Sequence, residues 1–235
     1  MQFKREALML RSVDFGESDR MVTLLTAEGK LSASMKGVRK ASAKLRFAAQ
    51  PFCFAEYVFS RTGARNTVIS ASIYDGFYAL RENISCFYAA AVVSEACDKL
   101  VYEDTESGAF LVAAVNALKE LCSEHADARG ILVGFLLRAL SLAGYAVRAD
   151  VCPVCRKRPR GLLRFSMESG AFGCAECLSE GVRASENTFT VVNAALDGKT
   201  SDDEDGKLRA LRLLNAYFEN RTETPLPALK EFLKL

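Results

Sequence analysis

The chain has 235 residues, of which 50% are hydrophobic and 26% charged, and its mean hydropathy is +0.06. These values are typical of a globular protein with one or two domains, and no run of about 18 apolar residues exists that could cross a membrane. The first eleven residues, MQFKREALMLR, carry charges within a short apolar run, which does not fit a secretory signal peptide. We therefore expect a cytoplasmic protein.

The formal net charge of +2 hides four blocks of alternating sign. Residues 1–80 carry 12 basic and 7 acidic side chains, whereas residues 81–150 carry 6 and 10. Residues 151–184 are basic again, with 6 basic and 3 acidic side chains. Residues 185–235 are mildly acidic, with 7 basic and 9 acidic side chains. This distribution indicates that particular segments, rather than the whole chain, bind a polyanion.

The first 80 residues predict a small β-barrel. Five short segments combine aromatic or β-branched residues with turn signals between them. Five strands in about 75 residues fit the OB-fold, which is a five-stranded Greek-key barrel, and strand counting leaves an SH3-like barrel open as the alternative. The expected strands cover residues 7–13, 21–26, 31–38, 52–60 and 67–74.

From residue 81 onward the apolar residues recur at helical spacing, which predicts a helical region. Gly144 is the expected stop of the third helix. The acidic stretch SDDED, residues 201–205, precedes the fourth helix, where the helix dipole favours negative charge. The expected helices cover residues 84–100, 110–121, 131–143, 208–218 and 228–235.

Four of the eight cysteines form two C-x-x-C pairs, CPVC and CAEC, with 18 residues between them. Two such pairs at this separation match a tetrahedral zinc site with four thiolate ligands. Since sulfur fills all four positions, no place is left for water, and the zinc would be structural, with one ion per chain. A rubredoxin-like iron site and a redox dithiol are the alternatives. The predicted ligands are Cys152, Cys155, Cys174 and Cys177.

A purely basic segment, KGVRKASAKLR, follows the third predicted strand. No acidic residue lies between Glu28 and Glu56. The single sign of the charges and their place beside a β-barrel favour DNA binding over a merely solvated charge run, because lysine and arginine neutralise phosphates. The predicted DNA-binding residues of this segment are Lys36, Arg39, Lys40, Lys44 and Arg46.

Two further features could contact DNA. Aromatic residues near the basic segment could stack on bases, as in many OB-folds, although we expect most of them in the barrel core. The run RKRPR, residues 156–160, leaves the first cysteine pair and either contacts phosphate or only solubilises its loop. We include Arg156, Lys157 and Arg158 among the predicted DNA-binding residues. The aromatic residues are Phe47, Phe52, Phe54, Tyr57 and Phe59.

Motifs for nucleotide hydrolysis are absent from the sequence, which has neither a G-x-x-x-x-G-K-[ST] nor a G-x-G-x-x-G stretch. The single histidine, His125, offers no recognisable Ser–His or Cys–His pair. We therefore expect a binding protein rather than an enzyme. The competing classes are a zinc-ribbon regulatory protein that binds duplex DNA sequence-specifically and a metal-dependent redox or hydrolytic enzyme.

The order and spacing of these features resemble the RecO family of bacterial DNA repair and recombination mediators over essentially the whole chain. The stretch ALMLRSVDFGESDRMVTLLTAEGKLSASMKGVRK, residues 7–40, resembles the start of the family, which leads into a basic loop. The stretch LLRALSLAGYAVRADVCPVC, residues 136–155, resembles the entry to the family's zinc motif. It departs from the family at residues 147–149, where a proline is common. Some members lack the zinc cysteines, whereas this chain has all four.

The resemblance implies an α+β protein, with an N-terminal five-stranded OB-fold barrel and an α-helical region into which a four-cysteine zinc ribbon is inserted. It implies binding of single- and double-stranded DNA and annealing of complementary strands. With RecR, the protein would help to load recombinase onto DNA coated by single-stranded DNA-binding protein (SSB). RecF is a further candidate partner, no membrane is involved, and we expect a nucleoid-associated, cytoplasmic location.

The resemblance also predicts how the chain is divided into domains. We expect an OB-fold DNA-binding domain at residues 1–80, and a helical domain at 81–150 that continues at 184–235 after the zinc ribbon at 151–183. An acidic SSB tail that ends in a hydrophobic residue would need an apolar pocket with a basic rim. The predicted residues for binding this tail are Arg129, Arg138 and Arg148.

Overall fold

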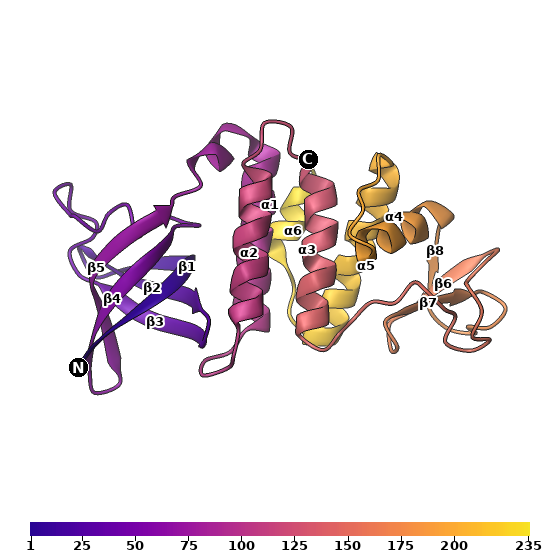
Figure 1. The fold of residues 1–235 in the computed structure, drawn as a ribbon, viewed down its shortest axis with the longest axis horizontal. Coiled ribbons are helices and arrows are strands. Elements are labelled where there is room, and N and C mark those ends of the chain that lie inside the picture. Colours follow the sequence, from indigo (N-terminus) through magenta and orange to yellow (C-terminus); the bar gives the residue numbers. More distant parts are fainter. The chain divides into compact units, whose positions relative to one another are not determined.

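The computed structural model describes residues 1–235, and the chain divides into two compact units. The first unit, Met1–Glu124, holds a closed β-barrel, a short 3-10 helix and two α-helices (Figure 1). The second unit, His125–Leu235, holds four α-helices and a three-stranded sheet. No helix is both long enough and apolar enough to cross a membrane.

Five strands close into the barrel of the first unit. Their order around the barrel is β1-β2-β3-β5-β4, and β3 pairs with β5 in parallel at Ser34 and Thr67 while the other neighbours are antiparallel. This is the topology of the OB-fold, so the predicted fold class is confirmed and the SH3-like alternative is wrong. The strands are β1 (Gln2–Phe15), β2 (Asp19–Thr26), β3 (Gly29–Met35), β4 (Phe54–Thr62) and β5 (Arg65–Asp75).

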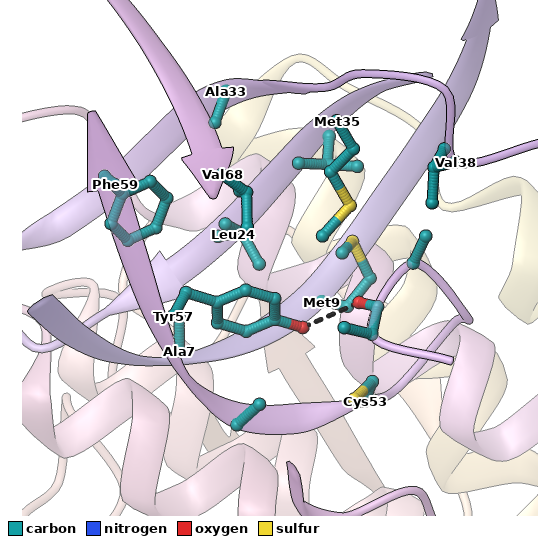
Figure 2. Close-up of a cluster of buried hydrophobic side chains, with 14 residues drawn as sticks. Ala7, Met9, Leu24, Ala33, Met35, Val38, Cys53, Tyr57, Phe59 and Val68 are labelled. Carbon is teal, nitrogen blue, oxygen red and sulfur yellow. Dashed lines mark hydrogen bonds between the residues drawn. The ribbon is translucent and has the colours of Figure 1, made fainter. Parts of the chain in front are cut away.

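Alternate residues of the strands point inward and form the barrel core (Figure 2). Met9, Leu24 and Tyr57 are fully buried there. The Tyr57 hydroxyl donates a hydrogen bond to the carbonyl of Ala48 at 2.8 Å, and burial raises the pKa of Tyr57, so the hydroxyl stays a neutral donor. Because Ala48 belongs to the long segment between β3 and β4, this bond fastens that segment to the barrel.

Two α-helices pack against β1 and β2 of the barrel. Leu8 and Leu25 are cross-strand partners. They alternate along their strands with residues of the barrel core and therefore point to the outside of the barrel. Both are nevertheless fully buried, because the helices cover them. The ammonium group of Lys30 binds the carboxylate of Asp98 at 3.3 Å and fastens β3 to the first of these helices. A fragment that ended at residue 80 would expose this apolar surface. The elements after the barrel are η1 (Tyr78–Glu82), α1 (Ile84–Leu100) and α2 (Gly108–Leu121).

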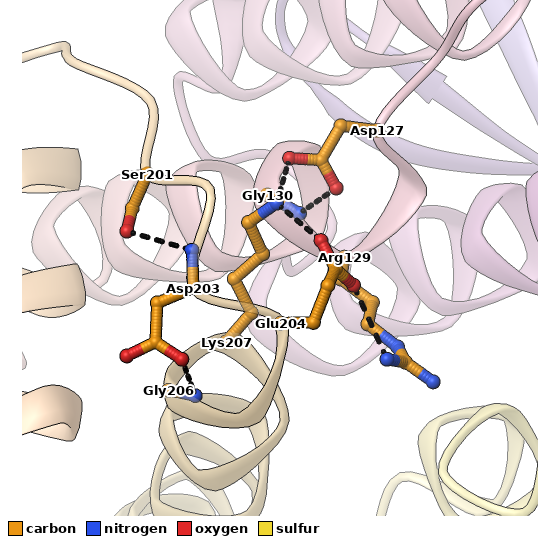
Figure 3. Close-up of polar contacts among 8 residues, drawn as sticks. All are labelled: Asp127, Arg129, Gly130, Ser201, Asp203, Glu204, Gly206 and Lys207. Atoms are coloured by element: carbon orange, nitrogen blue, oxygen red, sulfur yellow. Dashed lines mark hydrogen bonds and ion pairs between the residues drawn. The ribbon is translucent and has the colours of Figure 1, made fainter.

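In the second unit, α5 packs against both α3 and α4. The buried ammonium group of Lys207 joins the N-termini of α3 and α5, since it binds the carboxylates of Asp127 and Glu204 at 2.5 and 2.6 Å (Figure 3). The sequence predicts a strand at residues 162–166, where β6 lies, but neither helix α4 nor strands β7 and β8 are among the predicted elements. The elements of this unit are α3 (Ala128–Leu142), β6 (Leu163–Ser166), β7 (Ala171–Cys174), β8 (Val182–Ala184), α4 (Glu186–Leu196), α5 (Glu204–Thr222) and α6 (Pro227–Phe232).

The division of the chain into four segments stays a prediction. The compact units group these segments differently, because the first unit joins the barrel to residues 81–124 and the second begins at His125 with α3.

Candidate metal centre and nucleic-acid interface

The four predicted metal ligands come together in the second unit, where their sulfur atoms all lie within 4.8 Å of one another. A zinc ion with Zn–S bonds of about 2.3 Å would hold four tetrahedral sulfur atoms about 3.8 Å apart. The cluster therefore fits one ion after only a small contraction, and four thiolates are a donor set of structural zinc sites. The cysteines of this cluster are Cys152, Cys155, Cys174 and Cys177.

Each cysteine pair lies in a tight turn that brings its two sulfur atoms to the same side. In the first turn, the amide of Arg156 donates to the carbonyl of Cys152 at 3.0 Å, and Arg156 adopts a left-handed backbone with φ 59°. In the second turn, the amides of Cys177 and Leu178 both donate to the carbonyl of Cys174 at 3.0 Å. Short-range hydrogen bonds thus close both turns.

The backbone around Cys152 favours the thiolate form of this residue. Burial raises the pKa of the Cys152 thiol, but backbone N–H groups of Cys155, Val154 and Cys174 outweigh burial and lower this pKa to about 6. The pKa of Cys177 is raised to about 12, first by its hydrogen bond with Cys155 and also by burial. A bound cation favours the thiolate form, so metal binding would displace the remaining thiol protons.

Aromatic contacts hold the ribbon against the helices of the same unit. Its three strands are antiparallel in the order β7-β6-β8. Phe165 of β6 and Phe172 of β7 are fully buried, and their ring centroids are 5.0 Å apart. Phe165 also contacts Tyr217 of α5 at 5.2 Å, and Phe172 contacts Phe189 of α4 at 5.4 Å. The ribbon is therefore anchored at its strands as well as at its cysteines.

Residues 36–53, which we call the basic cap, form an ordered segment between β3 and β4. Val38, Ala48, Ala49 and Cys53 of the cap pack into the barrel core (Figure 2). The structure places all five predicted DNA-binding cations of the cap on its exposed side. They are Lys36, Arg39, Lys40, Lys44 and Arg46.

Arg39 differs from the other four cations of the basic cap. Its guanidinium donates to the carbonyls of Gly16 and Glu17 at 3.3 Å and pairs with Asp14 at 3.3 Å. It therefore fastens the cap to the turn between β1 and β2. The cations without an acidic partner, which are free to bind an anion, are Lys36, Lys40, Lys44 and Arg46.

The predicted cations of the ribbon lie on the loop between the first cysteine pair and β6, where two cavities of about 430 and 720 Å³ open. Lys157 and Arg158 line both cavities, together with Arg160, which the prediction did not include. Arg156 lines neither cavity and is exposed. Since three of the cluster cysteines border the larger cavity, the ribbon presents a basic concave surface directly beside its metal ligands.

The three arginines predicted for SSB-tail binding are not gathered at one place. Arg129 binds Glu204 at 3.2 Å, and Arg148 donates to the carbonyl of Ser169 at 3.3 Å. Arg138 follows Arg129 by nine residues on α3, so at about 100° per residue the two lie on opposite faces of the helix. Another pocket of the second unit, of about 270 Å³, combines an apolar lining with three other arginines. These arginines are Arg183, Arg209 and Arg212.

The topology and the cysteine cluster together define a class: an OB-fold barrel protein whose helical second unit carries a four-cysteine ribbon. Models of known families match nearly the whole chain. The family "Recombination protein O N terminal" matches residues 1–77, and the family "Recombination protein O C terminal" matches residues 81–230. The chain belongs to the RecO family of DNA repair proteins, as the resemblance of the sequence implies.

Individual relatives agree with the family models. DNA repair protein RecO of Myxococcus xanthus (strain DK1622) is 34% identical over 228 residues, which cover 96% of this chain and 85% of the relative. DNA repair protein RecO of Shouchella clausii (strain KSM-K16) is 30% identical over 182 residues, which cover 77% and 71%. DNA repair protein RecO of Bacillus pumilus (strain SAFR-032) is 28% identical over 181 residues, which cover 77% and 70%.

Proposed function

We propose that this protein is a DNA repair and recombination mediator that works by binding and not by catalysis. It binds single- and double-stranded DNA, anneals complementary strands, and with RecR helps to load recombinase onto single-stranded DNA coated by SSB. The observation that carries this proposal is the basic cap of the OB-fold barrel, with its four exposed cations that no acidic side chain neutralises. The cytoplasm and nucleoid are the matching location, and RecF is a further candidate partner.

The basic cap supports annealing for an electrostatic reason. Two complementary strands repel each other through their phosphates, and bound cations screen that repulsion and release counterions. Strand pairing itself is downhill by about 1.4 kcal/mol per base-pair step, so it needs no nucleotide hydrolysis. The basic surface beside the cysteine cluster, lined by Lys157, Arg158 and Arg160, would supply further phosphate contacts.

We propose zinc as the metal of the cysteine cluster, since its donor set and sulfur separations fit this ion. Four protein ligands leave no open coordination position, so the ion would hold the two cysteine turns together and would not activate a substrate. A zinc-ribbon regulatory protein is the alternative function. It receives no support from the relatives, which are named as DNA repair proteins.

For the SSB tail, the pocket lined by Arg183, Arg209 and Arg212 meets the chemical requirement better than the scattered arginines of the prediction. Its apolar wall, which includes Leu213 and Ala216, suits a hydrophobic terminal side chain. Arg183 and Arg212, which have no acidic partner, suit a carboxylate, whereas Arg209 pairs with Asp205 at 2.8 Å. We therefore propose this pocket as the tail site.

The first prediction tests annealing directly. Complementary single strands coated with SSB should anneal faster with the protein than without it, and the rate should be the same with and without ATP, because the sequence has no phosphate-binding loop. Fluorescence quenching between labelled strands measures the rate. A clear gain on adding ATP and magnesium, beyond the effect of magnesium alone, would contradict a mechanism based on binding.

The second prediction tests the basic cap. Four phosphate contacts made by the cap would contribute about −2.8 to the single-strand salt slope, from ~0.7 per contact. Replacing Lys40 and Lys44 together with alanine should flatten this slope by about 1.4 and weaken binding to all sequences alike. Arg39 is left in place because its ion pair and hydrogen bonds hold the cap to the barrel. Fluorescence anisotropy across a salt series measures the slope.

The matched control removes two positive charges elsewhere. Lys199 and Lys234 are exposed, and each pairs with an acidic neighbour, at 3.7 and 2.7 Å respectively. Their double alanine variant changes the net charge equally and should leave the slope unchanged. An unchanged slope in a folded Lys40/Lys44 variant, or an equal change in the control, would overturn the assignment of the cap as a DNA-binding surface.

A further inference from the structure

One aromatic side chain of the basic cap is not part of the barrel core. Phe47 is 62% exposed as a whole residue, whereas Phe52, Tyr57 and Phe59 are at most 3% exposed. Phe54 is half-buried and packs against Tyr74, with ring centroids 5.2 Å apart. Of the aromatic residues near the basic segment, only Phe47 therefore offers a free ring face to a ligand.

The backbone that carries Phe47 is held in place. The next two residues, Ala48 and Ala49, are buried in the barrel core, and the carbonyl of Ala48 accepts the hydrogen bond from Tyr57 (Figure 2). The carbonyl of Phe47 itself accepts a hydrogen bond from the amide of Gln50 at 3.2 Å. The ring is thus presented to solvent from an ordered segment and would lose little conformational freedom when a ligand covers it.

The charges near this ring indicate which kind of ligand it can bind. Lys44 and Arg46 precede Phe47 in the chain by three residues and by one residue; both are exposed, and neither has an acidic partner. A flat apolar face beside unpaired cations suits a ligand that is aromatic and anionic at the same time. A nucleobase with its phosphates meets both conditions.

We propose that Phe47 stacks on a base of single-stranded DNA whose neighbouring phosphates lie against Lys44 and Arg46. This inference rests on the proposed DNA binding of the basic cap and adds a preference for single strands. In a duplex, neighbouring base pairs cover the faces of each base, whereas an unpaired strand leaves a face free for the ring. The cations attract both forms of DNA, and Phe47 discriminates between them.

The chain provides a matched control in Phe15, the last residue of β1. Phe15 is 61% exposed, nearly the same fraction as Phe47. Its surroundings differ, because Asp14 and Glu17 are close in the chain and the nearby Arg39 is already paired with Asp14. Phosphates are therefore less favoured at Phe15 than at Phe47. Replacing either phenylalanine with alanine removes nearly the same exposed apolar area.

The third prediction compares Phe47→Ala, Phe47→Leu and Phe15→Ala in the full chain, with an oligo-dT strand and a duplex as ligands. Phe47→Ala should weaken binding to the single strand by at least about fivefold, the lower range for loss of one base stack, and duplex binding by less than twofold. Phe47→Leu should behave in the same way, since leucine keeps the apolar volume but has no ring. Phe15→Ala should leave both affinities within twofold.

A spectroscopic test reports the stack itself. The chain contains no tryptophan, so Phe47→Trp introduces a single indole. Its emission should be quenched when oligo-dT binds and should change much less with the duplex, whereas Phe15→Trp should show neither effect. Equal losses at Phe47 and Phe15, full binding by Phe47→Leu, or an indole at position 47 that does not respond to oligo-dT would overturn the inference.

These outcomes separate this inference from the proposed function. If the Lys40/Lys44 variant flattens the salt slope while Phe47→Ala binds normally, the basic cap binds DNA without stacking. If the Lys40/Lys44 variant has no effect on either ligand, the cap is not a DNA surface and the proposed function loses its main support.

Discussion

Replacing Cys155 with serine is expected to lower bound zinc to well below one ion per chain and to make the ribbon sensitive to proteases. The variant leaves three thiolates in a cluster whose sulfur atoms lie within 4.8 Å of one another. Structural zinc sites contribute an apparent ~10–16 kcal/mol at neutral pH to the segments that they hold. Metal analysis and limited proteolysis of the wild type and the variant measure the two effects.

In the Cys155→Ser variant, proteases should cleave first where the ribbon is least packed. The turn segments around the cysteines have little core of their own, since Val154 is 58% and Leu162 84% exposed. Phe165 and Phe172 are fully buried against Tyr217 and Phe189. We therefore expect early cleavage at residues 151–162 and 174–181, and slower cleavage within β6 and β7.

Cys122 provides the matched control for this experiment. It is half-buried like Cys155 but does not belong to the cluster, so Cys122→Ser should keep its zinc and its protease resistance. A wild type that carries no zinc and still resists proteases would contradict the zinc assignment. Bound iron with a thiolate charge-transfer colour would favour the rubredoxin-like site, and a disulfide without metal would favour the redox dithiol.

The barrel could be predicted because its strands are rich in apolar and β-branched residues, with clear alternation of burial in β4, and because local signals mark turns between them. The Ala-Glu-Gly-Lys stretch at residues 27–30, where the chain turns from β2 into β3, is one such signal. The first part of β1 was missed because Lys4, Arg5 and Glu6 are charged. Tertiary pairing with β4 nevertheless makes this part a strand, and Phe3 stacks on Phe59 at 5.0 Å.

Helix α4 was missed because its β-branched residues, such as Thr190 and Val191, favour a strand locally. A capping signal was present, however. Ser185 accepts a hydrogen bond from the amide of Thr188 at 3.2 Å and Glu186 begins the first turn, which is a helix-start pattern readable in the sequence. The short strand β8 depends on pairing with β6, from which all of β7 separates it in the chain, whereas β7 pairs with β6 after a short connection at residues 167–170.

For the candidate site, too, one part could be predicted from the sequence and another part could not. Two-residue spacings specify the cysteine turns, so the cluster could be predicted from local sequence alone. The basic cap could be predicted as a charged segment, but sequence could not separate the anchoring role of Arg39 from the free charges of Lys40 and Lys44. Nor could it separate the exposed ring of Phe47 from the buried ring of Phe52, since burial there depends on how the cap enters the barrel core.

Replacing Lys207 with alanine is expected to destabilise the second unit by about 2 kcal/mol. The side chain of Lys207 is only 4% exposed, and its ammonium group binds Asp127 and Glu204 (Figure 3). Hydrogen bonds to charged groups contribute about 1.5–3 kcal/mol, and the lower part of this range applies because both carboxylates left behind still reach water, with 35% and 59% of their side chains exposed. The two carboxylates make further contacts at the start of α3. Asp127 accepts a hydrogen bond from the amide of Gly130 and so caps the helix, and Glu204 also binds Arg129.

Urea unfolding of the full chain, followed by helical circular dichroism, measures this loss. Arg209→Ala is the matched control, because Arg209 pairs with Asp205 one turn away on α5 at 2.8 Å, but both side chains are more than half exposed. Exposed helical pairs of this kind contribute only about 0.3–0.5 kcal/mol. Equal stabilities of the two variants would contradict a structural role for the buried lysine.

The pH dependence gives this prediction a second measurement. Burial lowers the pKa of Lys207, but the hydrogen bonds and charges of Asp127 and Glu204 outweigh burial, and the net shift is upward. A group whose pKa is higher in the folded state stabilises the fold below its unfolded pKa, which is about 10.4 for lysine, and this contribution is lost as the pH rises through the folded pKa. The stability difference between wild type and Lys207→Ala should therefore stay constant from pH 7 to about pH 9 and shrink only above the usual pKa of lysine. A difference that disappeared between pH 7 and 9 would mean that Lys207 is neutral in the folded protein and that the two carboxylates do not hold its charge.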